Sequence, residues 1–208
     1  MIAIVDYGMG NLQSVWKALR YLHCDAVITD EPATIKNADG LIVPGVGAFS
    51  PAMEALTSKG LDIAIKEFAA TGKPVLGICL GMQLFLDSSE EGASEDSPIK
   101  GLGLIPGKVV KFPSDLTVDS GLKVPQIGWN SLTDVTGDLL AEGDHVYFVH
   151  SYYCIPDDPK DCAAMTEYGL KYCVSLQKGN IFATQFHPEK SGEAGLQILL
   201  KFAGRTRR

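Results

Sequence analysis

The sequence has no apolar run of membrane-spanning length, and no basic segment precedes the strand-like start at Met1–Ala3. A transmembrane helix needs about 20 consecutive apolar residues, and a targeting peptide needs a positively charged start. We therefore expect no membrane partner and no ordinary signal or transit peptide. Basic residues are also in the minority: 18 Lys and Arg against 25 Asp and Glu give a net charge of −7, which disfavours nucleic acid as a partner.

Cysteine is scarce, and its spacing suggests no disulfide framework. The five cysteines are an odd number without a closely spaced pair, at positions Cys24, Cys79, Cys154, Cys162 and Cys173. This usage predicts a reduced, cytoplasmic protein. No Cys or His pair has zinc-finger spacing, and His145 and His150 lie in a strand-like run where residues five apart face opposite sides. We therefore expect no metal.

Glycine-rich turns are present, but none has the pattern of a nucleotide-binding loop. Gly8–Gly10 mimics the start of a dinucleotide fingerprint, yet Gln13 stands where a glycine is required. Gly45–Gly47 fails likewise, because the third slot holds Ser50. We therefore expect no cofactor.

Strand-like and helix-like patterns alternate along the first half of the chain. Helical spacing falls around Leu12–Leu22, Met53–Leu56 and Leu61–Phe68, between strand-like runs at Ile2–Asp6, Ala26–Thr29 and Leu41–Val43. The second half is richer in strands, which we expect at Lys108–Phe112, His145–Ile155, Ala163–Glu167, Tyr172–Leu176 and Ile181–Phe186, before a closing helix at Glu193–Ala203. A hairpin turn is expected between the last two strands, and the acidic stretch Ser89–Ser97 is expected to be a surface excursion.

These patterns predict an α/β fold built as one domain over residues 1–208. Alternation favours a three-layer sandwich, with a central, mostly parallel sheet, helices on both faces and extra antiparallel strands in the second half. The length suffices for one sizeable core, and 46% hydrophobic with 21% charged residues is ordinary for a globular protein.

The most informative segment is Pro74–Leu86, where an apolar, β-prone run enters a Gly-x-Cys-x-Gly turn and leaves as an apolar, helix-prone run. This is a nucleophile elbow with sulfur in place of hydroxyl. The turn crowds its central residue, so Gly77 and Gly81 are needed to leave room. Cys79 is then expected at a helix N-terminus, where the dipole favours the thiolate. The alternative is that Cys79 is a small buried hydrophobe.

A nucleophilic thiol needs a base, and the base needs a group to orient it. The strand-like run near the C-terminus ends at His187, and Glu189 follows two residues later. If the chain stays extended there, both side chains lie on one face. The three residues then have the logic of a catalytic triad in the chain order Cys, His, Glu.

Two motifs, Gly77–Gln83 and Gln185–Glu189, resemble those of the triad-type (class I) glutamine amidotransferases. Four further segments narrow the resemblance to the glutaminase subunits of imidazole glycerol phosphate synthases, which serve histidine biosynthesis: Asp6–Leu12, Pro44–Gly47, Gln126–Asn130 and Tyr147–Tyr152. The resemblance runs from the first strand to the last helix. It implies the class I amidotransferase fold and hydrolysis of L-glutamine.

On this resemblance, Cys79 attacks the side-chain amide of glutamine, and His187 protonates the leaving amine and then activates water. Glu189 holds the imidazole in its working tautomer. The oxyanion needs amide donors, which we expect from Leu80 and from the loop Gly45, Val46 and Gly47; in the resembling family this loop can require a peptide flip. The alternative for the loop is a plain strand-to-helix turn. Gln83 is implied as a contact to the substrate; otherwise it is a surface helix residue.

Ammonia released into water becomes ammonium and is lost as a nucleophile, so enzymes of this type pass it to a synthase through a protein-lined route. The resemblance implies a heterodimer with a barrel-fold cyclase subunit, which makes imidazole glycerol phosphate and aminoimidazole carboxamide ribonucleotide. It also implies a set of interface or gate residues: Trp129, Asn130, Tyr147, His150 and Lys190. From the residues alone, Trp129 and Tyr147 are equally plausible core aromatics.

Three other functions stay open. The chain could be the glutaminase of another synthase, such as one of anthranilate or purine biosynthesis, although Phe148–Tyr152 argues against it. It could be a stand-alone hydrolase of γ-glutamyl amides, fully active without a partner. It could also be a catalytically silent binding subunit, against which the intact triad speaks.

Overall fold

The computed structural model describes residues 1–94, 97–114 and 121–206. The apolar runs of the first half lie side by side as parallel strands, in the order β2 (Ala26–Thr29), β1 (Ile2–Val5), β3 (Gly40–Gly45) and β4 (Val75–Cys79). Strand β13 (Ile181–Thr184) continues this parallel order beside β4. All residues of β1, β3, β4 and β13 are buried, as expected of a sheet covered on both faces.

The second half of the chain extends the same sheet with mainly antiparallel strands. Beyond β13 the order is β12 (Lys171–Lys178), β10 (Tyr152–Pro156), β7 (Gly107–Lys111), β5 (Ser88–Ser94) and β6 (Ser97–Lys100), and β11 (Cys162–Glu167) pairs with β12. Lys178 pairs with Ile181, so the predicted hairpin turn between β12 and β13 is confirmed.

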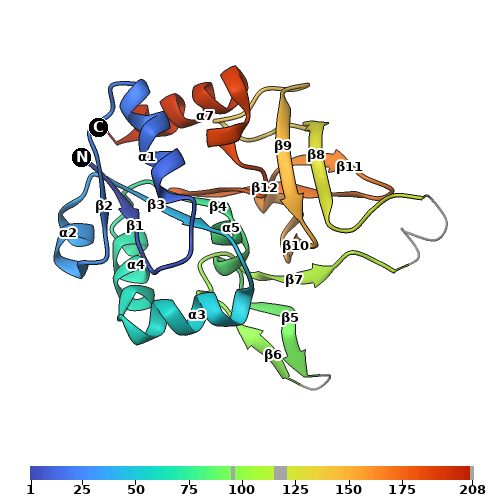
Figure 1. Ribbon diagram of the computed structural model, residues 1–208, viewed down its shortest axis with the longest axis horizontal. Coiled ribbons are helices and arrows are strands. Elements are labelled where there is room, and N and C mark those ends of the chain that lie inside the picture. Colours follow the sequence, from blue (N-terminus) through green and yellow to red (C-terminus); the bar gives the residue numbers. More distant parts are fainter. Residues whose placement is uncertain (95–96, 115–120, 207–208) are drawn as a thin grey trace.

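Helices cover both faces of this sheet (Figure 1). One face carries α1 (Leu12–Tyr21) and α7 (Gly192–Arg205), and the other carries α3 (Phe49–Ser58) and α4 (Leu61–Ala70), with α2 (Pro32–Asn37) packed against α4. Each face has its own apolar cluster, and the clusters include Leu19 and Phe202 on the first face and Phe49 and Phe68 on the second. The predicted three-layer α/β fold is confirmed. In the described part of the chain, no helix is long and apolar enough to cross a membrane.

A second, two-stranded sheet of β8 (Gln126–Ser131) and β9 (His145–His150) stands beside the main sheet (Figure 1). The prediction of one strand over His145–Ile155 is wrong, because the chain breaks at Ser151 between β9 and β10. Strand β9 pairs with β8, whereas β10 pairs with β7 and β12 of the large sheet. Apolar and aromatic residues occur on both sides of Ser151. The local sequence pattern therefore does not show that the chain passes from one sheet to the other at this residue.

Four elements were not expected from the sequence. Within the predicted surface excursion Ser89–Ser97, of which residues 95 and 96 lie outside the described residues, strands β5 and β6 pair antiparallel, and β5 joins the main sheet through β7. These edge strands are polar and lack an apolar alternation, so their periodicity is not visible in the sequence. Helix α2 and strand β8 were not expected either. Only Ile35 of α2 is buried, and β8 leaves most of its residues at least partly exposed.

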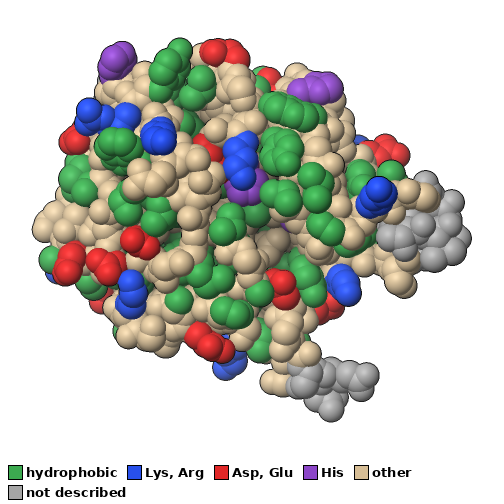
Figure 2. Space-filling model, viewed as in Figure 1, with side chains coloured by type: hydrophobic (Ala, Val, Ile, Leu, Met, Phe, Trp, Pro, Cys, Tyr) green, Lys and Arg blue, Asp and Glu red, His purple; other side chains and the backbone are tan. Residues whose placement is uncertain are grey.

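The surface carries mixed charges on the face drawn in Figure 2, where basic side chains stand among acidic and apolar ones without gathering into a patch. Nucleic-acid-binding domains gather Lys and Arg on one face or stripe. The described residues of this face lack such a stripe.

Candidate active site

Cys79 is the last residue of β4 and directly precedes helix α5 (Leu80–Leu84). Its backbone has φ of 56° and ψ of −110°, a conformation that costs free energy for a residue with a side chain. The predicted elbow is therefore present. Helix α5 has only five residues, so fewer aligned peptide dipoles act on the thiol than a long helix would supply.

The glycines flanking Cys79 are required for space, as predicted. A Cβ on Gly81 would lie 1.8 Å from the carbonyl oxygen of Val43, in the neighbouring strand β3. A Cβ on Gly77 would lie 2.8 Å from the carbonyl oxygen of Gly81. Both distances are below van der Waals contact, so a side chain at Gly81 would separate the elbow from β3, and one at Gly77 would push α5 away from β4.

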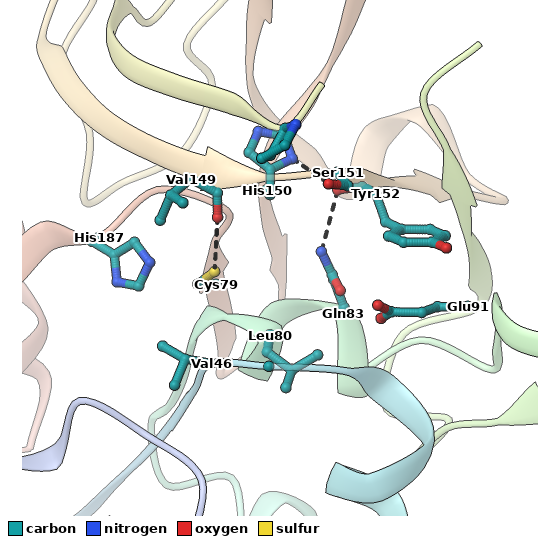
Figure 3. Close-up of a pocket in the computed structure, with 12 residues that line it drawn as sticks. Val46, Cys79, Leu80, Gln83, Glu91, Val149, His150, Ser151, Tyr152 and His187 are labelled. Carbon is teal, nitrogen blue, oxygen red and sulfur yellow. Dashed lines mark hydrogen bonds between the residues drawn. The ribbon is translucent and has the colours of Figure 1, made fainter. Parts of the chain in front are cut away.

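His187 and Glu189 follow β13, the strand that lies beside β4. Nδ1 of His187 donates a hydrogen bond to Oε1 of Glu189 at 2.8 Å, and Asn11 Nδ2 donates to the same oxygen at 3.3 Å. A carboxylate only accepts, so Nδ1 carries the hydrogen and Nε2 of the neutral ring is left free for proton transfer. Figure 3 shows the imidazole directed toward Cys79.

The chain between these two residues is a turn, so the predicted extended geometry is wrong. Pro188–Lys190 form a single turn of 3-10 helix, η2, in which Pro188 occupies the first position. Ser191 Oγ donates to the His187 carbonyl at 2.6 Å and closes the turn. The turn places the Glu189 carboxylate beside the His187 ring. In an extended strand the same result would come from side chains two residues apart lying on one face.

The electrostatics of this site favour a protonated imidazole. Burial favours the neutral form of His187, but the neighbouring Cys79 and Glu189 outweigh burial and raise the pKa of His187 to about 9. In the described part of the chain, Nε2 of His187 and Oε2 of Glu189 are buried without a hydrogen-bond partner. The Nε2 atom of His187 is therefore not engaged by another group of the described residues and remains available for proton transfer beside Cys79.

Two buried amide side chains, Gln83 and Gln185, form a chain of contacts that ends at the Cys79 sulfur. Gln83 donates through Nε2 to the Tyr152 carbonyl at 3.2 Å and to Gln185 Oε1 at 3.0 Å. Gln185 in turn directs Nε2 at the Cys79 sulfur, 3.8 Å away, while that thiol lies 3.9 Å from the Val149 carbonyl oxygen. Gln83 is thus a buried residue at the floor of the site, and the alternative of a surface helix residue is wrong.

These groups line a pocket of about 400 Å³ that opens to solvent. Its walls come from the loop after β3, the elbow and α5, β5, the residue before β8, the end of β9, the start of β10 and the residues after β13. The lining residues are Val46, Gly47, Cys79, Leu80, Gln83, Glu91, Pro125, Val149, His150, Ser151, Tyr152 and His187. Glu91 of β5 lies near Gln83 in Figure 3. Burial raises the pKa of Glu91, although its hydrogen bond from the Phe49 N–H, at 2.9 Å, opposes the shift.

The expected oxyanion loop lies next to the nucleophile because of sheet register. Gly45 pairs with Cys79 across β3 and β4, so the residues after Gly45 emerge beside the elbow. Val46 and Gly47 line the pocket with Leu80, and Figure 3 shows Val46 beside Leu80, whereas Gly45 is buried at the end of β3. Gly47 has φ of 98°, which L side chains rarely adopt.

The expected interface residues do not form one cluster. Trp129 of β8 is 56% exposed and meets Tyr147 of β9 edge-to-face, with ring centroids 5.9 Å apart, so the core-aromatic alternative is wrong for Trp129. Asn130 Nδ2 donates to the Glu167 carbonyl at 2.8 Å, and Lys190 is exposed at the end of η2. His150 is a buried part of the pocket wall, and burial lowers the pKa of His150 to about 4.

Four residues of the site were not singled out from the sequence: Tyr7, Asn11, Glu91 and Gln185. Asn11 and Gln185 lie inside motifs that carry the family resemblance, so a polar residue beside the motif was the available signal. Glu91 lies in the acidic stretch expected to be a surface excursion. Tyr7 lies inside the motif Asp6–Leu12, as Asn11 does, but a tyrosine after a buried strand is most often a core residue, so it was not singled out.

Comparison with known proteins agrees with this geometry. The chain matches the class-I glutamine amidotransferase family over residues 3–204. It is 50% identical over 208 residues to the imidazole glycerol phosphate synthase subunit HisH of Chlorobaculum tepidum, covering 98% of this chain and 99% of that one. The HisH subunit of Moorella thermoacetica is 48% identical over 205 residues, which cover 97% of this chain and 93% of that one.

A solved structure of a glutamine amidotransferase superposes with a TM-score of 0.72 at 19% identity, over 98% of this chain and all of the other. At this identity the match speaks for the fold alone. The sequence matches and the arrangement around Cys79 agree: this chain belongs to the class-I glutamine amidotransferase family and, within it, to the HisH subunits of imidazole glycerol phosphate synthase.

Proposed function

We propose that this chain is a glutaminase that supplies ammonia for imidazole glycerol phosphate synthesis in histidine biosynthesis. The observation that carries the proposal is the strained elbow of Cys79, which faces an imidazole held by Glu189 in one open pocket. Strain at a functional residue persists only where its surroundings enforce it. A buried structural cysteine needs neither that backbone nor an oriented histidine beside it.

The reaction runs in two steps. The Cys79 thiolate attacks the side-chain carbonyl carbon of glutamine, and the C–N bond breaks as protonated His187 gives its proton to the leaving nitrogen, which departs as ammonia. His187 then takes a proton from water, whose oxygen attacks the thioester and releases glutamate and the thiolate. The raised pKa of His187 suits the first step, because it keeps the imidazolium available near neutral pH.

Substrate contacts follow from the charges of a free amino acid. Glu91 places a carboxylate at the pocket wall, which suits the α-ammonium of glutamine, and Gln83 lies one helical turn from the nucleophile at the pocket floor. Exposed backbone of Ser151 and Tyr152 completes the wall. The space of about 400 Å³ admits an amino acid with its hydration waters.

The developing oxyanion needs donors within the same pocket. We assign one to the N–H of Leu80, directly after the nucleophile, and the other to the loop of Gly45, Val46 and Gly47. The register of β3 against β4 supports the assignment, since it delivers this loop to the elbow. One such donor is worth roughly two orders of magnitude in rate.

The proposed partner is a cyclase subunit with a barrel fold, which docks on the sheet of β8 and β9. Ile127 and Trp129 are 62% and 56% exposed on one face of β8, an unusual pair for a polar surface. Strand β9 reaches the catalytic groups directly: the His187 N–H donates to the Tyr147 carbonyl at 3.0 Å, and Cys79 lies against Val149. Docking at this sheet therefore acts on both nucleophile and base.

The remaining interface residues belong to this proposal. Asn130, His150 and Lys190 are assigned to the docking surface and to the gate through which ammonia leaves the pocket. The position of His150 in the pocket wall, between Val149 and Ser151, supports such a role. We also propose that residues 1–208 form one domain in a reduced, cytoplasmic setting, which is supported by five cysteines that form no disulfide bond.

The test is glutamate formation by the purified chain alone, with the cyclase subunit, and with cyclase plus its nucleotide substrate. We expect little activity alone and strong stimulation in the full mixture. Full activity of the chain alone would support the stand-alone hydrolase instead. Stimulation by an anthranilate or purine synthase, but not by the cyclase, would support the other amidotransferases.

A further inference from the structure

Tyr7 lies outside the pocket but in contact with the loop that faces the nucleophile. It follows β1, the strand beside β3, and is 2% exposed. Its hydroxyl donates a hydrogen bond to the carbonyl oxygen of Pro44 at 2.8 Å. A buried hydroxyl directed at the backbone of a neighbouring strand end holds that peptide in one orientation, because leaving either group unpaired is costly.

The hydroxyl also occupies the space beside Gly45. A Cβ built on Gly45 would lie 2.3 Å from Tyr7 Oη and 2.9 Å from the Cβ of Leu80. The loop is therefore clamped between the tyrosine and the elbow, and a side chain at Gly45 has no room. Val46, the next residue, is 39% exposed and stands in the open pocket.

The hydroxyl remains a donor at all ordinary pH values. Burial raises the pKa of Tyr7, and the negative charge of Cys79 raises it further. The hydrogen bond to Pro44 therefore persists when the thiolate forms, which is the state in which the loop must be in place.

We propose that Tyr7 is a positioning residue of glutamine hydrolysis: its hydroxyl fixes the peptide between Pro44 and Gly45 and so sets where the Val46 and Gly47 amides meet the oxyanion. The proposal rests on the function proposed above, in which this loop supplies an oxyanion donor. Tyr7 acts through the loop, since its hydroxyl is bonded to Pro44 and it is not among the residues that line the pocket. Its removal loosens the donors but leaves the nucleophile, the base and the substrate contacts in place.

The experiment compares wild type with Tyr7→Phe in the complex with cyclase and its nucleotide substrate. We expect kcat for glutamate formation to fall at least tenfold, with KM for glutamine within about twofold of wild type, because a misplaced donor is missed mainly in the transition state. Tyr168→Phe is the matched control: Tyr168 Oη also donates to a backbone carbonyl, that of Lys123, at 2.8 Å but at an exposed site. Its kcat should stay within twofold.

A second measurement separates positioning from a general structural role. Alkylation of Cys79 by iodoacetamide needs the thiolate but develops no oxyanion, so its rate in Tyr7→Phe should match wild type. An unchanged kcat would overturn the proposal. So would a parallel loss of kcat, alkylation rate and thermal stability, which would make Tyr7 a core residue only. Absence of glutamate formation by the wild-type complex would instead overturn the proposed function, before any variant is compared.

Discussion

At the residue scale, the candidate site combines Cys79, the proposed nucleophile with a strained backbone, and His187, the proposed base, whose pKa is raised. Two opposing effects act on His187: burial favours the neutral ring, while Cys79 and Glu189 favour the imidazolium, and the second effect is larger. For His150, close by in the pocket wall, burial is the largest effect. It outweighs the hydrogen bond with the Tyr152 carbonyl, so the pKa of His150 shifts the other way. The charged partners, rather than depth of burial, decide which of the two histidines can act as an acid.

The first prediction concerns the nucleophile. Cys79→Ser should abolish glutamate formation while leaving the fold and cyclase binding intact, because a serine hydroxyl is a far weaker nucleophile beside the same base. Cys162→Ser, a half-buried thiol on β11, is the matched control and should keep activity. Peptide mapping after labelling with a glutamine-like chloroketone checks the assignment. Labelling chiefly at another cysteine would contradict it.

The second prediction separates base from orienter. His187→Asn removes the proton shuttle and should cost more activity than Glu189→Gln, which removes only the orienting charge. Because Glu189 raises the pKa of His187, Glu189→Gln should also lower that pKa below about 9. NMR titration of the His187 ring measures the shift. Equal losses of activity with no change in the titration would mean that Glu189 does not act through the ring.

At the element scale, helix α7 sets the position of the turn that carries the base. Gly195 lies in its second turn, and a Cβ there would stand 1.9 Å from the carbonyl oxygen of Pro188. The helix can approach η2 this closely only because the position is glycine. The sequence near this helix shows a plain amphipathic pattern, whereas the contact with the triad turn comes from packing.

The third prediction uses two glycines of this one helix. Gly195→Ala should displace the turn at Pro188, reducing kcat at least tenfold and stability by about 2 kcal/mol, as overpacking in a tight contact does. Gly204→Ala has open space around its Cβ and should be neutral or stabilise by up to about 1 kcal/mol, since alanine favours helix. Urea unfolding and glutaminase assays of both variants provide the comparison. Similar behaviour of the pair would refute this role of Gly195.

At the scale of the whole molecule, the site lies where the main sheet meets the small sheet. Strands β3, β4 and β13 deliver the loop, the nucleophile and the base to their carboxyl ends, the usual place for sites in parallel sheets. The sheet of β8 and β9 lies against this edge, with Val146 and Phe148 buried on its inner face and Ile127 and Trp129 exposed on its outer face. One element thus contacts the catalytic groups on one side and, in our proposal, the cyclase on the other.

The fourth prediction tests that surface. Ile127→Asp places a charge in the centre of the proposed docking face and should weaken cyclase binding at least tenfold without changing the unstimulated activity. Ile63→Asp is the control, because Ile63 is 59% exposed on α4, away from this sheet. Titration calorimetry with the cyclase subunit measures both. A stronger effect of Ile63→Asp would move the interface elsewhere.

The fifth prediction is a stability maximum near pH 6.5. His150 stays neutral in the folded protein down to about pH 4, whereas the unfolded chain binds a proton below about 6.5, so stability falls as pH decreases through that range. His187 contributes stability that is present below about 6.5 and is lost as pH rises through about 9. The two slopes oppose each other and leave the maximum between them.

The matching experiment is urea unfolding between pH 4.5 and 9 for wild type and His150→Gln, with His145→Gln at the exposed end of β9 as control. Below about pH 6.5, the unfolding free energy of the His150 variant should depend less steeply on pH than that of wild type, by up to about 1.4 kcal/mol per pH unit. Above that pH the two slopes should agree. An unchanged acid slope would show that His150 titrates in the folded state as it does in the unfolded chain.

The sequence by itself determined the parallel half of the fold and the identity of Cys79, His187 and Glu189. Those features depend on local rules: buried strands are uninterrupted apolar runs, and an elbow needs glycines at fixed offsets. The family motifs also placed the loop after β3 near the nucleophile. The strand runs and the elbow each need only residues close together in the chain, whereas the roles of Cys79, His187, Glu189 and the loop stay predictions.

The tertiary structure decided what depends on distant partners. The break at Ser151, the hairpin of β5 and β6 and the turn at Pro188 all arise where the chain changes neighbours without changing its residue pattern. For the same reason Glu91, Gln185 and Tyr7 entered the site only when the sheet register brought them beside Cys79 and its loop. Tyr7 and Pro44 are 37 positions apart. Contacts over such separations produce no periodic pattern in the sequence, because they arise only when the folded elements pack together.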